Sequence, residues 1–414
     1  TGGTFDSDVS KYIPSGMTWD DETGKVTVDT SKAVASVNGV GYDDLQEAIN
    51  AAESKDTVTL LSNTTENVTV AEDDNIILDL NGFTLSGGTD KDSDGNDTVH
   101  KDKAAITNNG IITIRDSKGG GVIKRDDVNA SADSYYVLLN QGTMIIESGT
   151  IYNNSGVNGE GSSLICNLGT NSKEATLTIS GGKIQQDNFI AVKNDDYGIL
   201  NVTGGTIISN EQAIQNWNEA EVTGGTMRGD VITWSYIQVP NNAKMSISGG
   251  KIEGNVCSIN YYSNNSYGTA PEVTISDNAC VMGTLGTYTY NSGVQIPVAD
   301  DQAKITVNGG DFGNPVSELY LDESLTAELY STRRNPDAPY SYYKDTSEAL
   351  ENAQPGDNIT VVNSETVDTH KVTFNYNYNN GTSNVVAIVA DNERITLPTP
   401  DNRTGYTFNG WRSS

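Results

Sequence analysis

Over most of the chain, short runs in which apolar and polar residues alternate are separated by glycine doublets. The runs are rich in Ile, Val and Thr, and the same doublet pattern recurs with apolar residues on both sides. The doublet position falls at residues 148, 181, 204, 224, 249, 277 and 309, with a degenerate copy at 277, so successive copies are 20 to 33 residues apart. A repeat of this length with β-branched, alternating flanks is typical of a solenoid.

The repeats favour strands over helices, because none contains an amphipathic run of ten or more residues. A single repeat provides three short strands, which we expect at 190–193, 199–203 and 206–209, with Gly204-Gly205 at the bend between the last two. Glycine suits this bend because a positive φ costs it little, and it has no Cβ to obstruct the next coil. We therefore predict an all-β fold, a parallel β-helix whose inward apolar residues form rows along the axis.

A short amphipathic helix is predicted before the first coil. Leu45, Ala48, Ile49 and Ala52 share one helical face, and strands are expected afterwards at 57–61, 68–70 and 76–80. The end of a β-helix exposes unpaired strand edges that must be covered. The helix is thus predicted to cap the N-terminal end of the stack.

A second similarity relates the two ends of the chain. Gly2-Gly3-Thr4-Phe5 matches Gly309-Gly310-Asp311-Phe312, and the residues around the predicted helix match a segment 301 positions later. The pairs in that second match are Tyr42 and Tyr343, Asp44 and Asp345, Glu47 and Glu348, Ala48 and Ala349, and Ala52 and Ala353. We expect the tail of a preceding module at 1–32, the β-helix at 33–320, a partial second module at 321–366 and a separate module at 367–414. The chain is expected to be a monomeric fragment of a longer tandem array.

Two segments resemble known families. The region from Leu45-Gln46-Glu47-Ala48-Ile49 to Asn81-Gly82-Phe83-Thr84-Leu85 resembles pectate-lyase-like right-handed β-helices in surface proteins of Gram-positive gut bacteria. The C-terminal segment, with Gly405-Tyr406-Thr407-Phe408-Asn409-Gly410-Trp411, resembles the Listeria–Bacteroides (internalin-type B) repeat. The resemblance implies a right-handed β-helix, then a small β-grasp-like module, in an extracellular, cell-wall-attached protein. Many such proteins are adhesins or stalks.

The composition excludes several classes of function. The chain carries 55 acidic and 25 basic residues, a net charge of −30. Such a charge repels phosphate backbones and anionic lipid surfaces, so we expect neither nucleic-acid binding nor peripheral membrane binding. No run approaches 18 consecutive apolar residues, so we expect no membrane insertion either. The three cysteines lie among apolar neighbours and are expected to be buried.

Some β-helices of the type that the chain resembles are enzymes, namely polysaccharide lyases and glycoside hydrolases. The two histidines, His100 and His370, lie outside the regular repeats. The one aspartate pair on a coil is Asp195-Asp196, without a histidine or arginine on neighbouring repeats. We therefore predict a non-catalytic protein that requires no cofactor, with a polysaccharide-degrading enzyme as the alternative.

An aspartate-rich insert is the clearest candidate metal site. Asp90, Asp92 and Asp94 occupy alternate positions before Gly95, and Asp97 follows. Carboxylates at this spacing can converge on calcium, as at the start of an EF-hand loop. Position twelve is Lys101, so a complete EF-hand is excluded. The sequence allows either a structural calcium site or a solvated acidic loop.

Tyrosines gather in the last repeats and form the candidate ligand site. Tyr261, Tyr262, Tyr267, Tyr288 and Tyr290 are expected in long corner loops among Asn, Ser and Gly. Such tyrosines suit contact with sugars or proteins, although they could instead cover the end of the stack. Trp217 and Trp234, on consecutive repeats, are expected to cap a corner of the core. The predicted partner is a glycan or protein of a host or neighbouring cell.

Overall fold

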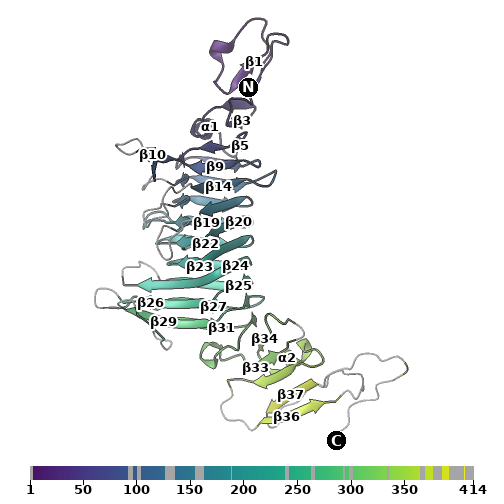
Figure 1. Cartoon of the computed structure of the whole chain (residues 1–414). Helices are drawn as coiled ribbons and strands as arrows, with labels where there is room; N and C mark the ends of the chain where they lie inside the picture. Colours follow the sequence, from purple (N-terminus) through teal and green to yellow (C-terminus); the bar gives the residue numbers. More distant parts are fainter. Residues whose placement is uncertain are drawn as a thin grey trace.

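In the computed structural model, the chain is mostly β and forms an elongated stack of strands (Figure 1). The structure describes residues 3–91, 97–99, 104–125, 136–153, 163–187, 189–237, 242–262, 266–291, 294–297, 302–332, 335–363, 369–375, 385–390 and 405. In the part of the chain that is described, no helix is long and apolar enough to cross a membrane.

The stack has three columns of parallel strands. Column A contains β7 (Val68–Val70), β12 (Ile106–Asn108), β15 (Leu138–Asn140), β18 (Ile165–Asn167), β21 (Val192–Asn194), the ends of β23 (Thr206–Asn216) and β24 (Glu219–Tyr236), β26 (Val256–Tyr261) and β29 (Leu285–Asn291). Column B contains β5 (Thr57–Leu60), β8 (Asn75–Asp79), β13 (Ile111–Arg115), β16 (Thr143–Ile146), β19 (Ala175–Ile179), β22 (Gly198–Val202), the starts of β24 and β25 (Lys244–Ile252), β27 (Glu272–Ile275) and β31 (Lys304–Val307).

Column C contains β6 (Thr64–Thr65), β9 (Thr84–Gly87), β14 (Val122–Arg125), β17 (Thr150–Asn153), β20 (Lys183–Gln186), parts of β23, β24 and β25, β28 (Cys280–Val281) and β32 (Asp311–Phe312). Within each column the strands pair in parallel, coil on coil. This parallel pairing is compatible with the β-solenoid that the repeat predicts.

Each glycine doublet lies at a bend where successive coils approach closely. Gly205 has φ +77°, in the left-handed region. A Cβ on Gly204 would lie 2.3 Å from the carbonyl oxygen of Ser180 in the preceding coil. The first glycine is therefore required by the close approach of two backbones and the second by its φ as well. The predicted role of the doublet is confirmed at this position.

The core consists of inward-facing apolar side chains that stack in register. One row in column B is made of residues that are all under 9% exposed: Ile76, Ile112, Met144, Leu177, Leu200, Ala220, Met245, Val273 and Ile305. Burying each larger side chain contributes about 1.5 to 3 kcal/mol. The continuous row explains why strands of only three to five residues form a stable sheet.

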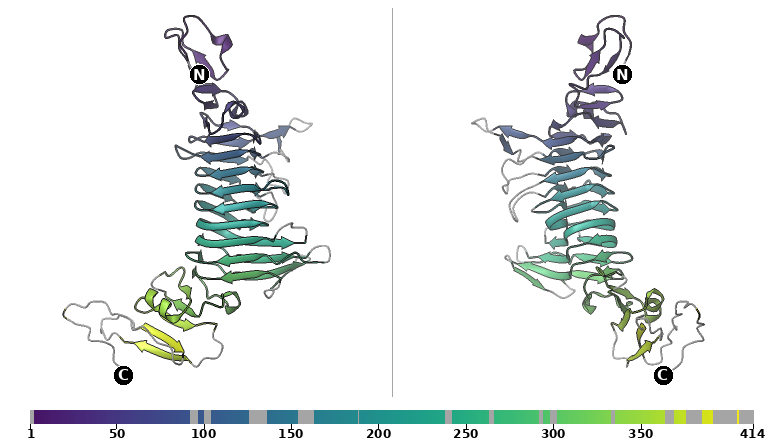
Figure 2. Two further views of the ribbon diagram at one scale, coloured as in Figure 1. Left: turned by 180° about the vertical axis from the view of Figure 1, so that it is seen from behind. Right: turned by 45° about the vertical axis from the view of Figure 1, so that its right-hand side comes forward.

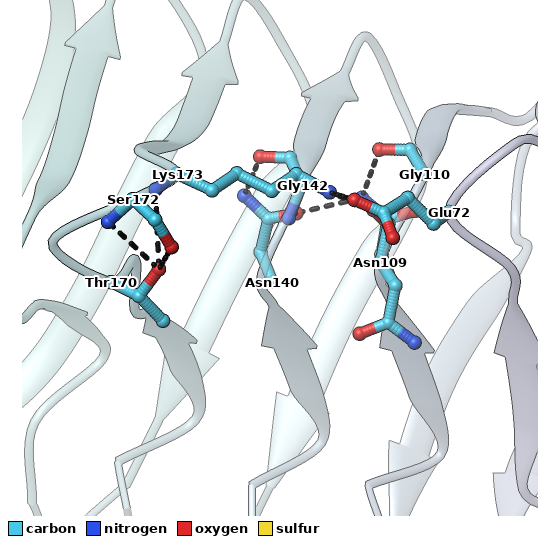
Figure 3. Close-up of polar contacts among 9 residues, drawn as sticks. Glu72, Asn109, Gly110, Asn140, Gly142, Thr170, Ser172 and Lys173 are labelled. Carbon is cyan, nitrogen blue, oxygen red and sulfur yellow. Dashed lines mark hydrogen bonds and ion pairs between the residues drawn. The ribbon is translucent and has the colours of Figure 1, made fainter.

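A row of buried asparagines lies in column A from β12 to β23, the five strands that follow β7. Asn108, Asn140, Asn167, Asn194 and Asn216 follow one another in register, and each of the first four donates from Nδ2 to Oδ1 of the next at 2.7 to 2.8 Å. The same amides bond backbone carbonyls of the following turn, such as Asn140 Nδ2 to Gly142 O at 3.1 Å (Figure 3). These bonds satisfy the turn backbone and fix where the chain leaves column A.

The side chain of Lys173 runs along the axis and connects its own coil to the coils that contain Asn109 and Glu72. Its Nζ donates to the carbonyl oxygen of Asn109 at 2.8 Å and to the Glu72 carboxylate at 3.0 Å (Figure 3). Both Lys173 and Glu72 are substantially exposed, so this ion pair contributes little on its own.

Before the first coil, a hairpin of β3 (Ala35–Val37) and β4 (Val40–Tyr42) leads into α1 (Leu45–Ala51). The Asp44 side chain caps α1 by accepting from Glu47 N at 2.8 Å. Leu45, Ala48 and Ile49 are fully buried against the core, as the sequence pattern predicts. A further hairpin, β1 (Met17–Trp19) with β2 (Val26–Val28), precedes this unit.

After the last coil, the chain repeats the arrangement of β3, β4, α1 and β5. Strands β33 (Ala327–Tyr330) and β34 (Tyr340–Tyr343) form a hairpin, α2 (Thr346–Asn352) follows, and β35 (Asn358–Val361) pairs antiparallel with β33. Asp345 caps α2 by accepting from Glu348 N at 2.8 Å, as Asp44 does for α1. Strands β36 (Thr369–Phe374) and β37 (Val385–Ala390) complete the far end (Figure 1).

Candidate ligand-binding face

In the last three coils the column A strands run on past the asparagine turn. In register with the asparagine row stand Thr233, Ser258 and Thr287, whose short side chains carry no amide to bond the turn backbone. Strands β24, β26 and β29 therefore continue for three or more residues and project beyond the earlier coils (Figure 2). Strand β30 (Val294–Pro297) pairs antiparallel with β29 and completes this projecting sheet.

Aromatic rings line the outward side of this sheet. The indoles of Trp217 and Trp234 stack with centroids 5.6 Å apart, and Trp234 contacts Tyr290 edge to face at 5.8 Å. Tyr290 stacks on Tyr261 at 5.2 Å, and Tyr236 meets Trp217 edge to face at 5.4 Å. We call the set the aromatic face: Trp217, Trp234, Tyr236, Tyr261, Tyr288 and Tyr290.

The aromatic face rests on a small apolar cluster of its own, apart from the main core. Ile232, Cys257 and Ile259 are buried there, with Trp234, Tyr288 and Tyr290 packed on them. The rings are half-buried, so part of each residue is open to solvent. Burial raises the pKa of Tyr288. The face is thus a mainly apolar surface that also carries phenol groups.

The reverse side of the projecting sheet is held by hydrogen bonds. Asn260 is fully buried there, and its Nδ2 donates to the carbonyl oxygens of Gly268 at 3.0 Å and Gln302 at 2.9 Å. Gly268 N donates back to Asn260 Oδ1 at 3.1 Å. These bonds tie the loop after β26 to the sheet, so the aromatic face stands on a fixed support.

The five tyrosines of the predicted ligand site lie in two different places in the structure. Tyr261, Tyr288 and Tyr290 lie on strands β26 and β29, not in corner loops, so that part of the prediction is wrong. The reason is the missing asparagine turn, which lets both strands continue through these positions. Tyr262 and Tyr267 do lie outside strands and pack on each other with centroids 4.9 Å apart.

Three residues of the face escaped the sequence interpretation. The sequence predicts that Trp217 and Trp234 cap a corner of the core, but Trp234 packs on the separate outer cluster. The sequence argument does not single out Tyr236. A signal was present in the alternation of Thr233-Trp234-Ser235-Tyr236, which the sequences of β26 and β29 repeat in register. Outward positions in these three segments are all large and apolar or aromatic.

A charged group borders the Trp217 end of the aromatic face. Asp195 occupies the position of Trp217 one coil earlier and forms an ion pair with Lys193 at 2.5 Å. Burial, together with the Asp195 charge, raises the pKa of the neighbouring Asp196 carboxyl. Burial and then the charges of Asp196 and Asp195 also raise the pKa of Tyr236, which places these carboxylates near its ring.

The aspartate-rich insert is described only at its ends. Strands β10 (Thr89–Lys91) and β11 (Asp97–Val99) pair antiparallel, so Asp90 and Asp97 lie on a hairpin, whereas Asp92 and Asp94 lie outside the described residues. Among the residues that are described, no three His, Cys, Asp or Glu side chains gather as a metal would require.

Comparison with known proteins gives no relative. No family model matches the chain, and neither a curated protein nor a solved structure matches it.

Proposed function

We propose that this chain is a non-catalytic adhesin or stalk module displayed on the surface of a Gram-positive bacterium. In this proposal the parallel stack is a right-handed, pectate-lyase-like β-helix, α1 is its cap, and the segment after residue 367 is a Listeria–Bacteroides-type module. The single observation that carries the proposal is the aromatic face, a rigid row of half-buried rings on a projecting sheet.

The elongated stack supports the spacer part of this role. Each coil pairs with its neighbours through three columns, so the coils bury a continuous core while the molecule extends along one axis (Figure 2). A rod of this kind would hold a contact surface away from the cell wall to which the protein is attached. The net charge of −30 disfavours nucleic acid and anionic lipid as the partner.

The chemistry of the face suits a glycan or a protein surface. Tyrosine and tryptophan provide large contact areas with little loss of side-chain entropy, and the phenol group donates hydrogen bonds. Because Trp217 stacks on Trp234 and Tyr261 on Tyr290, part of each ring face is covered by its neighbour. The ligand therefore meets ring edges and hydroxyl groups along the row, and open ring faces at its ends.

Binding should be measured on glycan arrays and on overlays of host matrix proteins, with wild type and two variants. Trp234→Ala removes the ring that joins Trp217 to Tyr290, and Tyr261→Ala removes a stacked partner. We expect each to weaken binding at least tenfold, about 1.4 kcal/mol, as central aromatic contacts do. Tyr12→Ala is the matched control, because Tyr12 is 75% exposed and lies in the N-terminal segment. Equal binding by all four proteins would overturn the assignment.

One observation favours the alternative of a polysaccharide lyase or glycoside hydrolase. Asp195 and Asp196 are adjacent carboxylates beside the aromatic face, and the raised pKa of Asp196 is a property of general acids. The test is incubation with polyuronates and host glycans, followed by assay for new reducing or unsaturated ends. Products that disappear in Asp196→Asn would establish the enzyme and reject the adhesin.

The proposal includes a structural calcium ion in the insert, held by Asp90, Asp92, Asp94 and Asp97. Its role would be to order the insert, because a cation bound by several carboxylates offsets their repulsion. We expect calcium to raise the midpoint of thermal unfolding, and the variant with Asp92→Asn and Asp94→Asn to lose that response. If calcium raised the unfolding midpoint of this variant as much as that of the wild type, the proposed calcium site would be rejected.

A further inference from the structure

A half-buried carboxylate at the Trp217 end of the aromatic face has no hydrogen-bond or ion-pair partner among the described residues. Lys193 pairs with Asp195 at 2.5 Å, and this leaves Asp196 as the second negative charge of the group. The Asp196 backbone is bonded, since its N–H donates to Asp195 Oδ1 at 3.1 Å and its carbonyl oxygen accepts from Gly169 N at 2.9 Å. Burial and then the Asp195 charge raise the pKa of the Asp196 carboxyl, because Lys193 offsets only part of the negative charge.

Two aromatic rings from the following coils stand beside this carboxylate. Trp217 N donates to Asn194 O at 2.7 Å, so Trp217 follows Asp195 in the register of column A. Tyr236 comes from the next coil and meets Trp217 at 88°, with ring centroids 5.4 Å apart. After burial, the charges of Asp196 and Asp195 raise the pKa of Tyr236, so its hydroxyl group lies near both carboxylates. We call this set the Trp217 corner: Trp217, Tyr236, Asp195 and Asp196.

The indole of the Trp217 corner is held in place by its neighbours. Its Nε1–H donates to Gln215 Oε1 at 2.8 Å, and Gln215 Nε2 donates to Gln212 Oε1 at 3.0 Å. One face of the indole stacks on Trp234, with centroids 5.6 Å apart. A ligand would therefore meet a ring that is already positioned, which lowers the entropic cost of binding.

The chemistry of the Trp217 corner favours a cation. The faces of an aromatic ring carry partial negative charge and attract ammonium and guanidinium groups within about 6 Å. Among the described residues, Lys11, over Tyr12, is the one basic side chain that lies over an aromatic ring, so neither ring of the corner has such a partner. Two carboxylates, Asp195 and Asp196, and one ammonium group, Lys193, leave one negative charge uncompensated.

We propose that the Trp217 corner binds a lysine or arginine side chain of a basic partner protein, with its charged end between the two rings and the Asp196 carboxylate. This inference rests on the proposed function, because it states which chemistry the ligand of the aromatic face carries. The net charge of −30 attracts a basic protein from a distance. The row of ring edges and hydroxyl groups beyond Trp234 suits the mixed polar and apolar surface of a protein, which favours a protein over a glycan as the occupant.

The probes are fluorescent peptides with blocked ends, Ser-Gly-Tyr-Lys-Tyr-Gly-Ser, titrated against the full chain. In matched peptides the lysine is replaced by Nε-acetyl-lysine, by Nε-trimethyl-lysine, or by the neutral analogue in which carbon replaces the trimethylammonium nitrogen. We expect the two charged peptides to bind about fivefold or more tightly than the two neutral ones, because only they provide a cation for the rings. The trimethyl pair has the same shape, so its difference reports charge alone.

Protein variants give a second readout. Asp196→Asn should weaken the charged peptides about fivefold or more and leave the neutral ones unchanged, and Tyr236→Leu should do the same, whereas Tyr236→Phe should have little effect. Lys193→Gln should tighten binding of the charged peptides, because it removes the competing positive charge, and a folding defect cannot produce such a gain. Asp73→Asn, at an exposed aspartate in the bend before β8, is the control and should change nothing.

The inference is overturned if no peptide binds, if the trimethyl-lysine peptide and its carbon analogue bind equally, or if Asp196→Asn leaves the charged peptides unaffected. Binding of a glucosamine oligomer in place of the peptides would also overturn it, because the occupant would then be a glycan. Each of these results can occur while a ligand found on the arrays still loses affinity in Trp234→Ala. Failure of the cation site is thus distinguished from failure of the proposed function.

Discussion

The side-chain amide of Gln46 forms two hydrogen bonds with the backbone of Thr69: Gln46 Nε2 donates to Thr69 O at 2.9 Å, and Thr69 N donates to Gln46 Oε1 at 2.7 Å. Helix α1 thereby presents one amide group to β7, the first strand of column A, in place of a neighbouring strand. The free edge of a sheet is otherwise open to pairing with another chain. This contact attaches α1 to the backbone of the first strand of column A.

Gln46→Ala should destabilise the chain by about 1 to 2 kcal/mol, because it removes both hydrogen bonds to Thr69. Chemical denaturation measures the loss. Glu47→Ala, on the exposed side of α1, is the control and should cost clearly less. The account of the end of column A is contradicted if the two substitutions have equal effects.

Three glycine substitutions separate backbone strain from crowding between coils. Gly39→Ala meets strain alone, since Gly39 has φ +77° and open space around it, and should cost about 1 to 2 kcal/mol. Gly204→Ala meets crowding alone, with Ser180 O 2.3 Å from the new Cβ, and should cost about 1 to 3 kcal/mol. Gly205→Ala combines both and should be the most damaging. Equal unfolding free energies for the three variants would refute the role assigned to the doublet.

The loss of stability caused by replacing an asparagine of the row should depend on its position in the row. Asn167 donates to Asn194 and accepts from Asn140, so Asn167→Ala leaves partners on both sides unsatisfied and should cost about 2 to 4 kcal/mol. Asn108 begins the row, and its Oδ1 has no partner, so Asn108→Ala should cost less. Thermal and urea unfolding of the two variants provide the comparison, and the reverse order would argue against a cooperative row.

Acid sensitivity should arise in part at Asp79. Burial opposes ionisation of this carboxyl, but hydrogen bonds from Ser117 and Asn81 and the charge of Arg115 outweigh it, so its pKa lies below the ordinary 3.8. A lowered pKa stabilises the fold at pH values above 3.8, and that contribution is lost as the pH falls through the folded-state value. Asp79→Asn should therefore be less stable than wild type at pH 7, with a gap that narrows in acid. A gap that is constant with pH would contradict this.

The sequence predicts the stack well because its determinants are local. The glycine doublet, the alternating apolar residues and the stripe of Leu45, Ala48 and Ile49 each act within one repeat. The strand expected at 206–209 is found as part of β23, which continues to Asn216 because a bend need not interrupt pairing. The offset of 301 residues that relates Tyr42 to Tyr343 also corresponds to two units with the same strand pairing.

The aromatic face was harder to predict because it depends on register between coils. Trp217, Trp234 and Tyr290 are widely spaced in the sequence and come together only when column A is aligned. Thr233 stands where the earlier coils have an asparagine, and this difference is seen only when the sequences of the coils are aligned in the register of the structure.

The most direct test of the proposed binding surface is tryptophan fluorescence. The chain has four tryptophans, and the variant with Trp19→Phe and Trp411→Phe leaves Trp217 and Trp234 as reporters. Titrated with a glycan or protein selected on the arrays, this variant should show a saturable change in emission, with the dissociation constant measured by direct binding. Undiminished binding with no change in emission would show that the ligand contacts the molecule elsewhere.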